Sequence, residues 1–178
     1  DAAAPASSLF VERRGTRLFL DGSPFRFAGA NMYWLALDEN VDGVAPPTRF
    51  RVDNGFATAR LMGATVVRSI SMGVSVGCPR CVEPALGVFN EAAFESMDYA
   101  IASARAHGLR LIVPLGDNYR FFSGGRFVFT DWRNITTPSC GLTCERGNEF
   151  YTDANVIYDY QEYIRHVLMH VNPRTGLA

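Results

Sequence analysis

Short, almost uninterrupted apolar runs alternate along this chain with longer segments in which apolar residues recur at helical spacing. The runs cover residues 25–31, 65–69 and 109–115. The helical segments cover residues 47–62 and 90–106, followed by a last one that Thr152 caps. Asn90 is the expected cap of the second segment. The expected apolar stripe of the first segment is Phe50, Phe56, Ala57, Leu61 and Met62, and that of the last is Val156, Ile157, Tyr160, Ile164, Val167, Leu168 and Val171. Runs without polar alternation are typical of parallel strands buried on both faces, and strand–helix alternation implies a parallel sheet with right-handed crossovers. The pattern therefore predicts an α/β fold of three strand–helix units.

A β-hairpin is predicted before the first of these units. Residues 10–12 and 17–20 flank the turn Arg14-Gly15-Thr16, a pattern typical of two antiparallel strands. In a closed barrel such a hairpin usually plugs the bottom. Residues 1–8 are Ala- and Ser-rich, and we expect them to form a flexible mature N-terminus left by removal of a leader.

Polar and aromatic residues stand at the carboxyl ends of the three apolar runs. They are Asn31, Tyr33 and Trp34 after the first run, Arg68 at the end of the second, and Asp117 and Asn118 after the third. A (β/α)8 barrel carries its active site on that face and takes about 250 residues, so three units cannot close one. We therefore expect residues 9–178 to be the N-terminal portion of a single (β/α)8 TIM barrel whose remainder lies outside this chain. A small doubly wound sheet is the alternative, but Gly29-Ala30-Asn31-Met32 is not the Gly-rich phosphate loop that it needs.

Charge and hydropathy narrow the range of partners and compartments. The net charge of −1 gives no electrostatic reason to expect nucleic acid or an anionic membrane as a partner. No run of about 18 apolar residues occurs, so no transmembrane helix is expected. Asn134-Ile135-Thr136 is a glycosylation acceptor in a secreted chain.

Four cysteines fall into two close pairs. The pairs are Cys78/Cys81 and Cys140/Cys144. We expect a local disulfide within each pair, which favours an oxidising, extracellular compartment. Cross-pair disulfides are the second possibility, and a zinc site built from both pairs is the third. The first pair also has redox-motif spacing, but Pro84 and Gly87 follow it where such a motif needs a helix.

Five segments carry a resemblance to a known family. They are the run from Phe25 to Trp34, Val66-Val67-Arg68, Gly124-Gly125 followed by Trp132, Phe150-Tyr151-Thr152-Asp153, and the helix end from Tyr163 to Gly176. In this order and spacing they resemble glycoside hydrolase family 5, closest to its endo-β-1,4-mannanases and related β-mannosidases. The chain departs from that pattern at Gly116-Asp117-Asn118-Tyr119, where these mannanases usually carry Asn and Trp.

The resemblance implies a retaining glycoside hydrolase that acts on β-1,4-linked mannan or mannooligosaccharides and needs no cofactor or metal. It implies that Arg68 holds the nucleophile carboxylate ionised and oriented, and that Trp132 is a sugar platform. The family's two catalytic glutamates end strands four and seven, which places both beyond Ala178. Retaining hydrolysis needs two carboxyl groups about 5–5.5 Å apart, and we assign this role to none of Asp117, Glu83 and Glu149.

Sugar contacts are predicted from the side chains beyond the strand ends. Aromatic faces stack on sugar rings and amides or carboxylates bind hydroxyls, which makes Asn31, Tyr33, Trp34, Asp117 and Asn118 the candidates. The expected partners are an oligosaccharide or polysaccharide and the rest of the barrel. An open three-stranded sheet leaves an apolar edge and face uncovered, so we do not expect residues 1–178 to fold stably alone.

Three other functions stay open at this point. The first is a non-catalytic carbohydrate-binding module that kept a glycosidase ancestor's subsites. The second is a β-glucan-active hydrolase of the same family, and the third is a redox or zinc protein that uses the cysteines.

Overall fold

The computed structural model describes residues 10–41, 43–135 and 147–177. The N-terminal residues 1–8, Cys140, Cys144 and Thr136 of the glycosylation motif lie outside the described residues. The predictions made for them therefore stay predictions.

Three parallel strands form the central sheet in the order β4-β5-β6. They are β4 (Gly29–Asn31), β5 (Val66–Arg68) and β6 (Arg110–Ile112). Asn31 pairs with Arg68, and Arg68 pairs with Ile112, so the carboxyl ends of the three strands lie level. The predicted parallel sheet is confirmed, although each strand is shorter than its apolar run.

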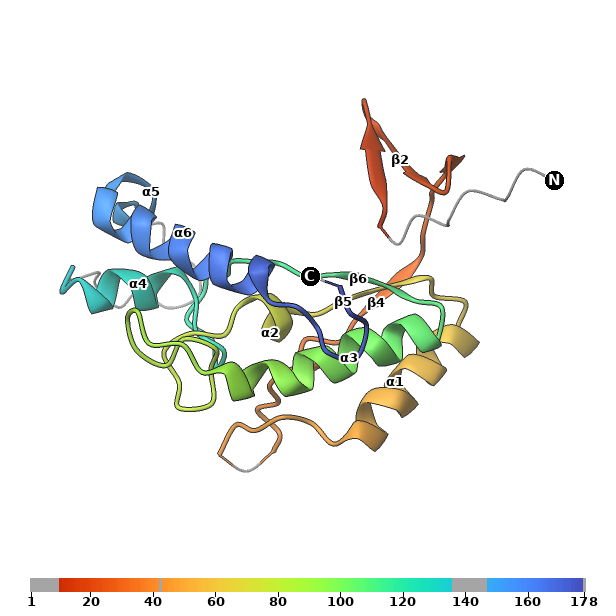
Figure 1. Cartoon of the computed structure of the whole chain (residues 1–178), viewed down its shortest axis with the longest axis horizontal. Coiled ribbons are helices and arrows are strands. Elements are labelled where there is room, and N and C mark those ends of the chain that lie inside the picture. The colour runs from red at the N-terminus through yellow and green to blue at the C-terminus, as the bar shows by residue number, and fades with distance from the viewer. Residues whose placement is uncertain (1–9, 42, 136–146, 178) are drawn as a thin grey trace.

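Helices α1 (Arg49–Leu61) and α3 (Phe94–Ala106) pack against each other and cover one face of this sheet (Figure 1). Helix α1 begins two residues after the predicted Pro47, because the Thr48 side chain accepts a hydrogen bond from the Arg51 amide at 3.2 Å and so caps the first turn. The predicted cap Asn90 makes no side-chain capping bond. It precedes one turn of 3₁₀ helix, η1 (Glu91–Ala93), which leads directly into α3.

Helix α6 (Ala154–Met169) is the third of the predicted helices. Its cap is Asp153 and not the predicted Thr152, because the Asp153 carboxylate accepts from the amides of Asn155 and Val156 at 2.9 and 3.1 Å. A carboxylate at this position also interacts favourably with the positive end of the helix dipole.

Three short helices lie in segments that the sequence pattern left as loops. They are α2 (Ile70–Gly73), α4 (Arg126–Trp132) and α5 (Glu149–Thr152). Helices α4 and α5 lie between the third strand and α6, and both contact α6. The carboxyl-end side of the sheet is therefore built largely from short helices and turns. None of the described helices is long and apolar enough to cross a membrane.

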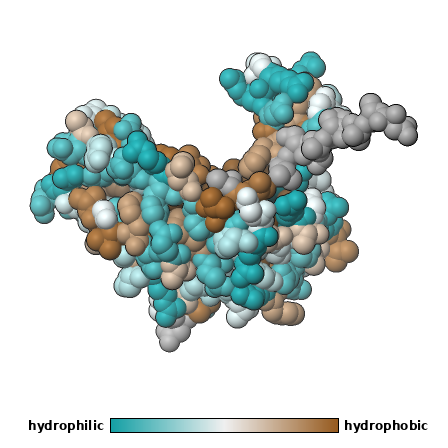
Figure 2. All heavy atoms as spheres, viewed as in Figure 1, coloured by the Kyte–Doolittle hydropathy of each residue, from teal (hydrophilic) through white to brown (hydrophobic). Residues whose placement is uncertain are grey.

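The N-terminal hairpin is confirmed, and it carries a third strand. Strands β1 (Glu12–Arg14) and β2 (Arg17–Leu20) pair as predicted, and β3 (Ser23–Pro24) adds to β2. The hairpin stands away from the body on the side opposite α1 and α3 (Figure 1). Figure 2 shows hydrophobic residues at the surface of the concave region between the hairpin and α6.

The core lies between the sheet and the helices, and its composition corrects two predicted stripes. In α1 the buried side chains are Val52, the expected Phe56 and Ala59, whereas the expected Phe50, Leu61 and Met62 are 79, 90 and 80% exposed. In α6 the core takes the expected Val156 together with Asp159 and Tyr163, and the expected Tyr160, Ile164 and Val167 pack against it. The expected Leu168, and Val171 beyond the end of the helix, are exposed. In both helices a narrower stripe faces the core than the apolar residues alone suggested.

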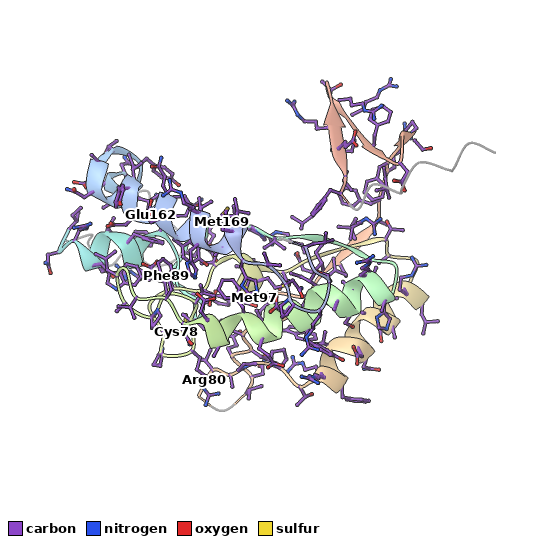
Figure 3. All side chains as sticks on the ribbon, viewed as in Figure 1. Cys78, Arg80, Phe89, Met97, Glu162 and Met169 are labelled. Carbon is purple, nitrogen blue, oxygen red and sulfur yellow. A yellow bond between two sulfur atoms is a disulfide. The ribbon has the colours of Figure 1, made fainter. Side chains whose placement is uncertain are left out.

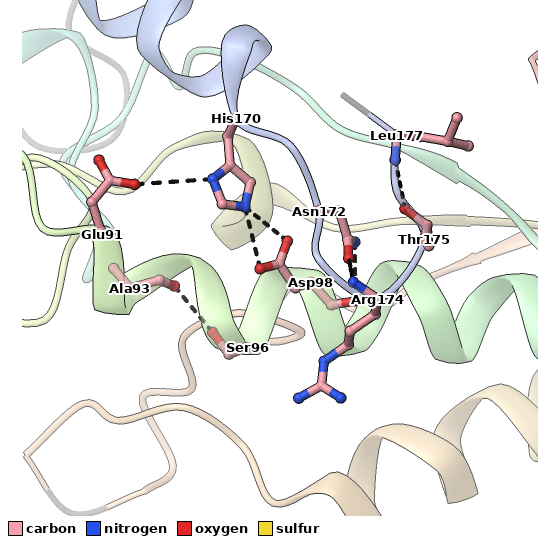
Figure 4. A network of polar contacts seen from close by, with 9 residues as sticks. All are labelled: Glu91, Ala93, Ser96, Asp98, His170, Asn172, Arg174, Thr175 and Leu177. Carbon is pink, nitrogen blue, oxygen red and sulfur yellow. Dashed lines mark hydrogen bonds and ion pairs between the residues drawn. The ribbon is translucent and has the colours of Figure 1, made fainter.

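The turn after α6 is tied to α3 by a polar network (Figure 4). His170 Nε2 lies 3.0 Å from an Asp98 carboxylate oxygen, and the Asn172 side chain donates to the Asp98 backbone oxygen at 3.2 Å. Burial raises the pKa of Asp98, although its hydrogen bond to His170 opposes that rise. The His170 ring stacks on Phe94 at 3.9 Å. These contacts fix the C-terminal end of α6 over α3.

Candidate active site

Arg68 and Asn31 lie side by side at the carboxyl ends of β5 and β4. The Arg68 guanidinium donates from Nη1 to the Asn31 side-chain oxygen at 3.4 Å. The parallel register pairs these two residues directly, and side chains of paired residues point to the same face of a sheet. Arg68 is half-buried and Asn31 is exposed, so a positive charge is presented at an accessible strand end.

Tyr33 lies in the loop after β4, two residues beyond Asn31. Its ring meets Phe121 and Phe122 edge-on, with ring centres 6.4 and 6.1 Å apart. Its hydroxyl accepts a hydrogen bond from the Asn40 side chain at 3.2 Å. The loops after β4 and β6 therefore meet at Tyr33. Sequence reasoning missed Phe121 and Phe122, and the adjacent aromatic pair in the loop after the third strand was the available signal.

Trp34 takes a different direction from its neighbour Tyr33. The Arg51 guanidinium lies 4.3 Å from the centre of its ring, and the side chain packs against the hydrophobic core. Because Arg51 belongs to α1, this packing places the indole against that helix. The structure does not bring Trp34 together with Arg68, Asn31 and Tyr33.

Asp117 and Asn118 line an open hollow between the loop after β6 and helices α5 and α6. The hollow has a volume of about 660 Å³ and is lined by Gly116, Asp117, Asn118, Arg126, Phe150, Tyr151, Ile157, Tyr160, Gln161 and Ile164. Both predicted residues also hold local structure. The Asp117 carboxylate accepts from the Tyr119 amide at 3.0 Å, and the Asn118 side chain accepts from the Tyr151 hydroxyl at 3.0 Å. Aromatic, amide, carboxylate and guanidinium groups converge here, which is a composition suited to a polar ligand such as a sugar.

Trp132 is the last residue of α4 and packs inward. Its ring meets Phe129 edge-on at 5.3 Å, and the side chain packs on the core. The structure therefore does not bring it together with the residues around Arg68. Asn134 follows two residues later, is exposed, and has a positive φ of 57°, so its side chain is accessible at the end of the helix.

Cys78 and Cys81 form a disulfide in the loop that precedes α3, with the exposed Arg80 between them (Figure 3). This is the local pairing expected for the first cysteine pair. It rules out a zinc site shared by all four cysteines, because both sulfur atoms of this pair are bonded to each other. Among the described residues, no group of His, Cys, Asp and Glu side chains is arranged to hold a metal ion.

Glu83 follows the disulfide and is buried, which sequence reasoning did not anticipate. It is 2% exposed, and burial raises its pKa from an ordinary 4.5 to about 7. One carboxylate oxygen accepts from the Gly87 amide at 2.8 Å. The other has no hydrogen-bond partner among the described residues. The Glu83 side chain lies within the protein, and its hydrogen bond to Gly87 holds the loop that follows the disulfide.

Chains of similar structure belong to carbohydrate-active enzymes. The structure of an endo-1,4-beta-mannanase from Rhizomucor miehei matches with a TM-score of 0.76 and 26% identity, over 94% of this chain and 44% of that chain. A glycoside hydrolase family 5 mannosidase from the same organism matches with a TM-score of 0.69 and 18% identity, over the same shares of the two chains. At that identity the second match supports the fold alone. The fold is thus one that this chain shares with part of a glycoside hydrolase.

Sequence comparison defines the family. The model for the GH family 5 beta-mannosidase-like family matches residues 8–178, and the chain belongs to this family. Mannan endo-1,4-beta-mannosidase 2 from Oryza sativa subsp. japonica is 41% identical, over 98% of this chain and 37% of that protein. Putative mannan endo-1,4-beta-mannosidase P from Arabidopsis thaliana is 33% identical, over 99% of this chain and 40% of that protein. The chain therefore spans well under half the length of these curated relatives.

Proposed function

We propose that this chain is the N-terminal part of a secreted, retaining glycoside hydrolase that acts on β-1,4-linked mannan or mannooligosaccharides. The family membership supports a glycosidase, and the names of the relatives support mannan as the substrate. The observation that carries the proposal is the Arg68–Asn31 pair at the level ends of two parallel strands. That is the edge at which barrel enzymes carry their catalytic groups.

Arg68 would bind a carboxylate without reacting itself. A guanidinium donates two parallel hydrogen bonds to a carboxylate and lowers its pKa, which keeps the nucleophile ionised and aimed at the sugar. The nucleophile and the acid/base glutamate would come from strands of the barrel outside these 178 residues. The nucleophile would form the glycosyl-enzyme, and the second glutamate would first protonate the leaving oxygen and then activate water.

Sugar contacts would come from side chains around Arg68 and along the hollow. Asn31 lies beside the guanidinium, Tyr33 follows it in the loop after β4 and packs against Phe121 and Phe122, and Asp117 and Asn118 line the hollow. Trp34 and Trp132 pack against the core, so we leave them out of the proposed subsites.

The remainder of the barrel is the proposed partner of this chain. The sheet has β4 at one edge and β6 at the other, and further parallel strands can pair with both. Phe27, just before β4, and Ile112, on β6, are exposed large apolar residues that such strands would cover. The Cys78–Cys81 disulfide and the exposed Asn134 fit an extracellular location.

The test is hydrolysis of mannohexaose and β-1,4-glucan by the whole protein that carries this chain, as wild type and as Arg68→Lys. We expect release of mannooligosaccharides with retained anomeric configuration in NMR spectra. Lysine cannot reproduce the bidentate guanidinium, so kcat/KM should fall roughly 10²- to 10³-fold in the variant. Arg80→Lys, at an exposed position, is the matched control.

Other outcomes of this assay would indicate a different function. Hydrolysis of glucan alone would indicate the β-glucan-active branch, and sugar binding without hydrolysis would indicate a binding module. Equal activity of wild type and Arg68→Lys would remove Arg68 from the mechanism.

A further inference from the structure

The Tyr33 hydroxyl is held by a side chain from a loop that sequence reasoning did not connect to the site. Asn40 Nδ2 donates to this hydroxyl at 3.2 Å. On its other side the Tyr33 ring rests edge-on against Phe121 and Phe122. The phenol is therefore held at its ring and at its oxygen.

Asn40 is in turn held by a buried carboxylate. Asp38 Oδ1 accepts both the Asn40 backbone amide and Asn40 Nδ2, each at 3.0 Å. Asp38 is fully buried, and its other carboxylate oxygen pairs with Arg51. Its backbone bridges to Ala45, with Asp38 N to Ala45 O at 2.9 Å and Ala45 N to Asp38 O at 3.3 Å. Asp38 thus pairs with Ala45 through its backbone and holds Asn40 through its side chain, which fixes the loop between them.

This arrangement determines which way the Asn40 amide points. An ionised carboxylate only accepts hydrogen bonds, so the NH2 group and not the oxygen must face Asp38. One of its two hydrogens goes to Asp38 and the other to the Tyr33 hydroxyl. The hydroxyl oxygen then accepts from Asn40, which leaves the Tyr33 O–H free to donate elsewhere.

In the Arg51–Asp38 pair the carboxylate is fully buried and the Arg51 side chain is 39% exposed. Desolvation of the carboxylate offsets much of the attraction between the charges, so the pair is weak evidence for stability. Its clearer consequence is that Asp38 orients the Asn40 amide, and through it the hydroxyl of Tyr33, which follows Asn31 by two residues in the loop after β4.

We propose that Asn40 is a positioning residue that, by donating to the Tyr33 hydroxyl, leaves the Tyr33 O–H to donate to a hydroxyl of a bound sugar. This inference rests on the proposed function, since it assigns the ligand of Tyr33 as a neutral β-linked mannose unit. Asp38 affects Tyr33 indirectly, because its carboxylate orients the Asn40 amide.

A double-mutant cycle tests the proposal in the whole protein that carries this chain, with mannohexaose as the substrate. The variants are Asn40→Ala, Tyr33→Phe and their combination, and Glu39→Ala, an exposed neighbour in the same loop, is the control. One lost hydrogen bond to a neutral partner corresponds to about a 3- to 10-fold rise in KM. We expect this rise, with kcat nearly unchanged, for each single variant, and no further rise in the double variant.

A spectroscopic readout separates positioning from loss of the loop. With ¹³C-labelled tyrosine, the ζ-carbon signal of Tyr33, identified by its absence in Tyr33→Phe, should shift in Asn40→Ala and stay in place in Glu39→Ala. Tyr33→Phe removes a single oxygen and keeps the ring packing, so it reports on the hydroxyl even where Asn40→Ala disturbs folding.

The outcomes distinguish this inference from the proposed function. If wild type binds and cleaves mannohexaose but the two substitutions are additive, or Tyr33→Phe leaves KM unchanged, the positioning role is wrong and the proposed function stands. If wild type neither binds nor cleaves the sugar, the proposed function fails, and the ligand assigned to Tyr33 fails with it.

Discussion

Glu83 should make the stability of this protein depend on pH in a direction opposite to that of most carboxylates. Its side chain is 2% exposed, and burial is the main reason why its pKa is raised from 4.5 to about 7, with the nearby Asp159 adding to the rise. Gly87 donates the one hydrogen bond that favours its ionised form. A single hydrogen bond does not offset the removal of water from a buried carboxylate.

The sign and the size follow from proton linkage. The unfolded chain releases the Glu83 proton near pH 4.5, whereas the folded chain keeps it until about pH 7. The stabilisation from the bound proton is therefore complete below pH 4.5, declines as the pH rises to 7, and is absent above that. At 1.36 kcal/mol for each pKa unit, the span from 4.5 to about 7 corresponds to roughly 3 kcal/mol.

The informative variant is Glu83→Gln, which has a similar shape and stays neutral at every pH. Urea denaturation of the protein carrying this chain, as wild type and variant, should be measured at about pH 4.5 and about pH 8, on either side of the interval over which Glu83 titrates. Other carboxylates titrate equally in both proteins, so the difference in unfolding free energy isolates Glu83. We expect this difference to move by about 2–3 kcal/mol in favour of the variant between the two pH values.

The control is Glu39→Gln, because Glu39 is exposed and should give the same difference at both pH values. A difference between Glu83→Gln and wild type that is constant across this range would refute the reasoning. It would mean that Glu83 ionises alike in the folded and unfolded chain.

Two further substitutions test the packing beneath the site. Tyr163→Phe removes a buried hydroxyl that accepts from the Ser75 amide and donates to the Gly73 carbonyl, both at 3.1 Å. Because two backbone groups lose their partner, the free energy of unfolding in urea should fall by about 2–3 kcal/mol. Gly73→Ala would place a methyl group 1.8 Å from the Pro114 carbonyl oxygen, so the free energy of unfolding should fall by about 3 kcal/mol or more. An unchanged melting temperature for either variant would contradict the packing described here.

The relation between Arg68 and Asn31 shows how far sequence patterns carry a site prediction. Apolar runs placed both residues at strand ends, and parallel pairing brings such ends to one edge. The pairing of Asn31 with Arg68 itself depends on the register, which the runs do not determine because they are longer than the strands. The Asn40 contact to Tyr33 could not be predicted from the sequence either, because it depends on how the loop closes through the backbone pairing of Asp38 with Ala45.

Helix α1 shows where hydrophobic periodicity misleads. The predicted stripe of Phe50, Phe56, Ala57, Leu61 and Met62 is right at Phe56, which is buried, and wrong at Phe50, Leu61 and Met62, which are exposed. The stripe that faces the core runs through Val52, Phe56 and Ala59. Apolar residues occur on more than one face of this helix, so periodicity alone does not determine which face is buried.

Helix α1 also carries an exposed apolar face at Phe50 and Leu61. Isolated apolar residues on a surface need no explanation, but Phe50 and Leu61 lie on one face of a helix at 79 and 90% exposure. In a closed barrel the first helix has a neighbour on each side, and in this chain only α3 occupies one of them among the described residues. Phe50 and Leu61 therefore belong to a surface that a later helix of the proposed barrel would cover. Hydrogen exchange in the whole protein provides the check: if the barrel closes as proposed, the amides of α1 should be as strongly protected as those of α3, and markedly faster exchange in α1 than in α3 would contradict the proposed covering.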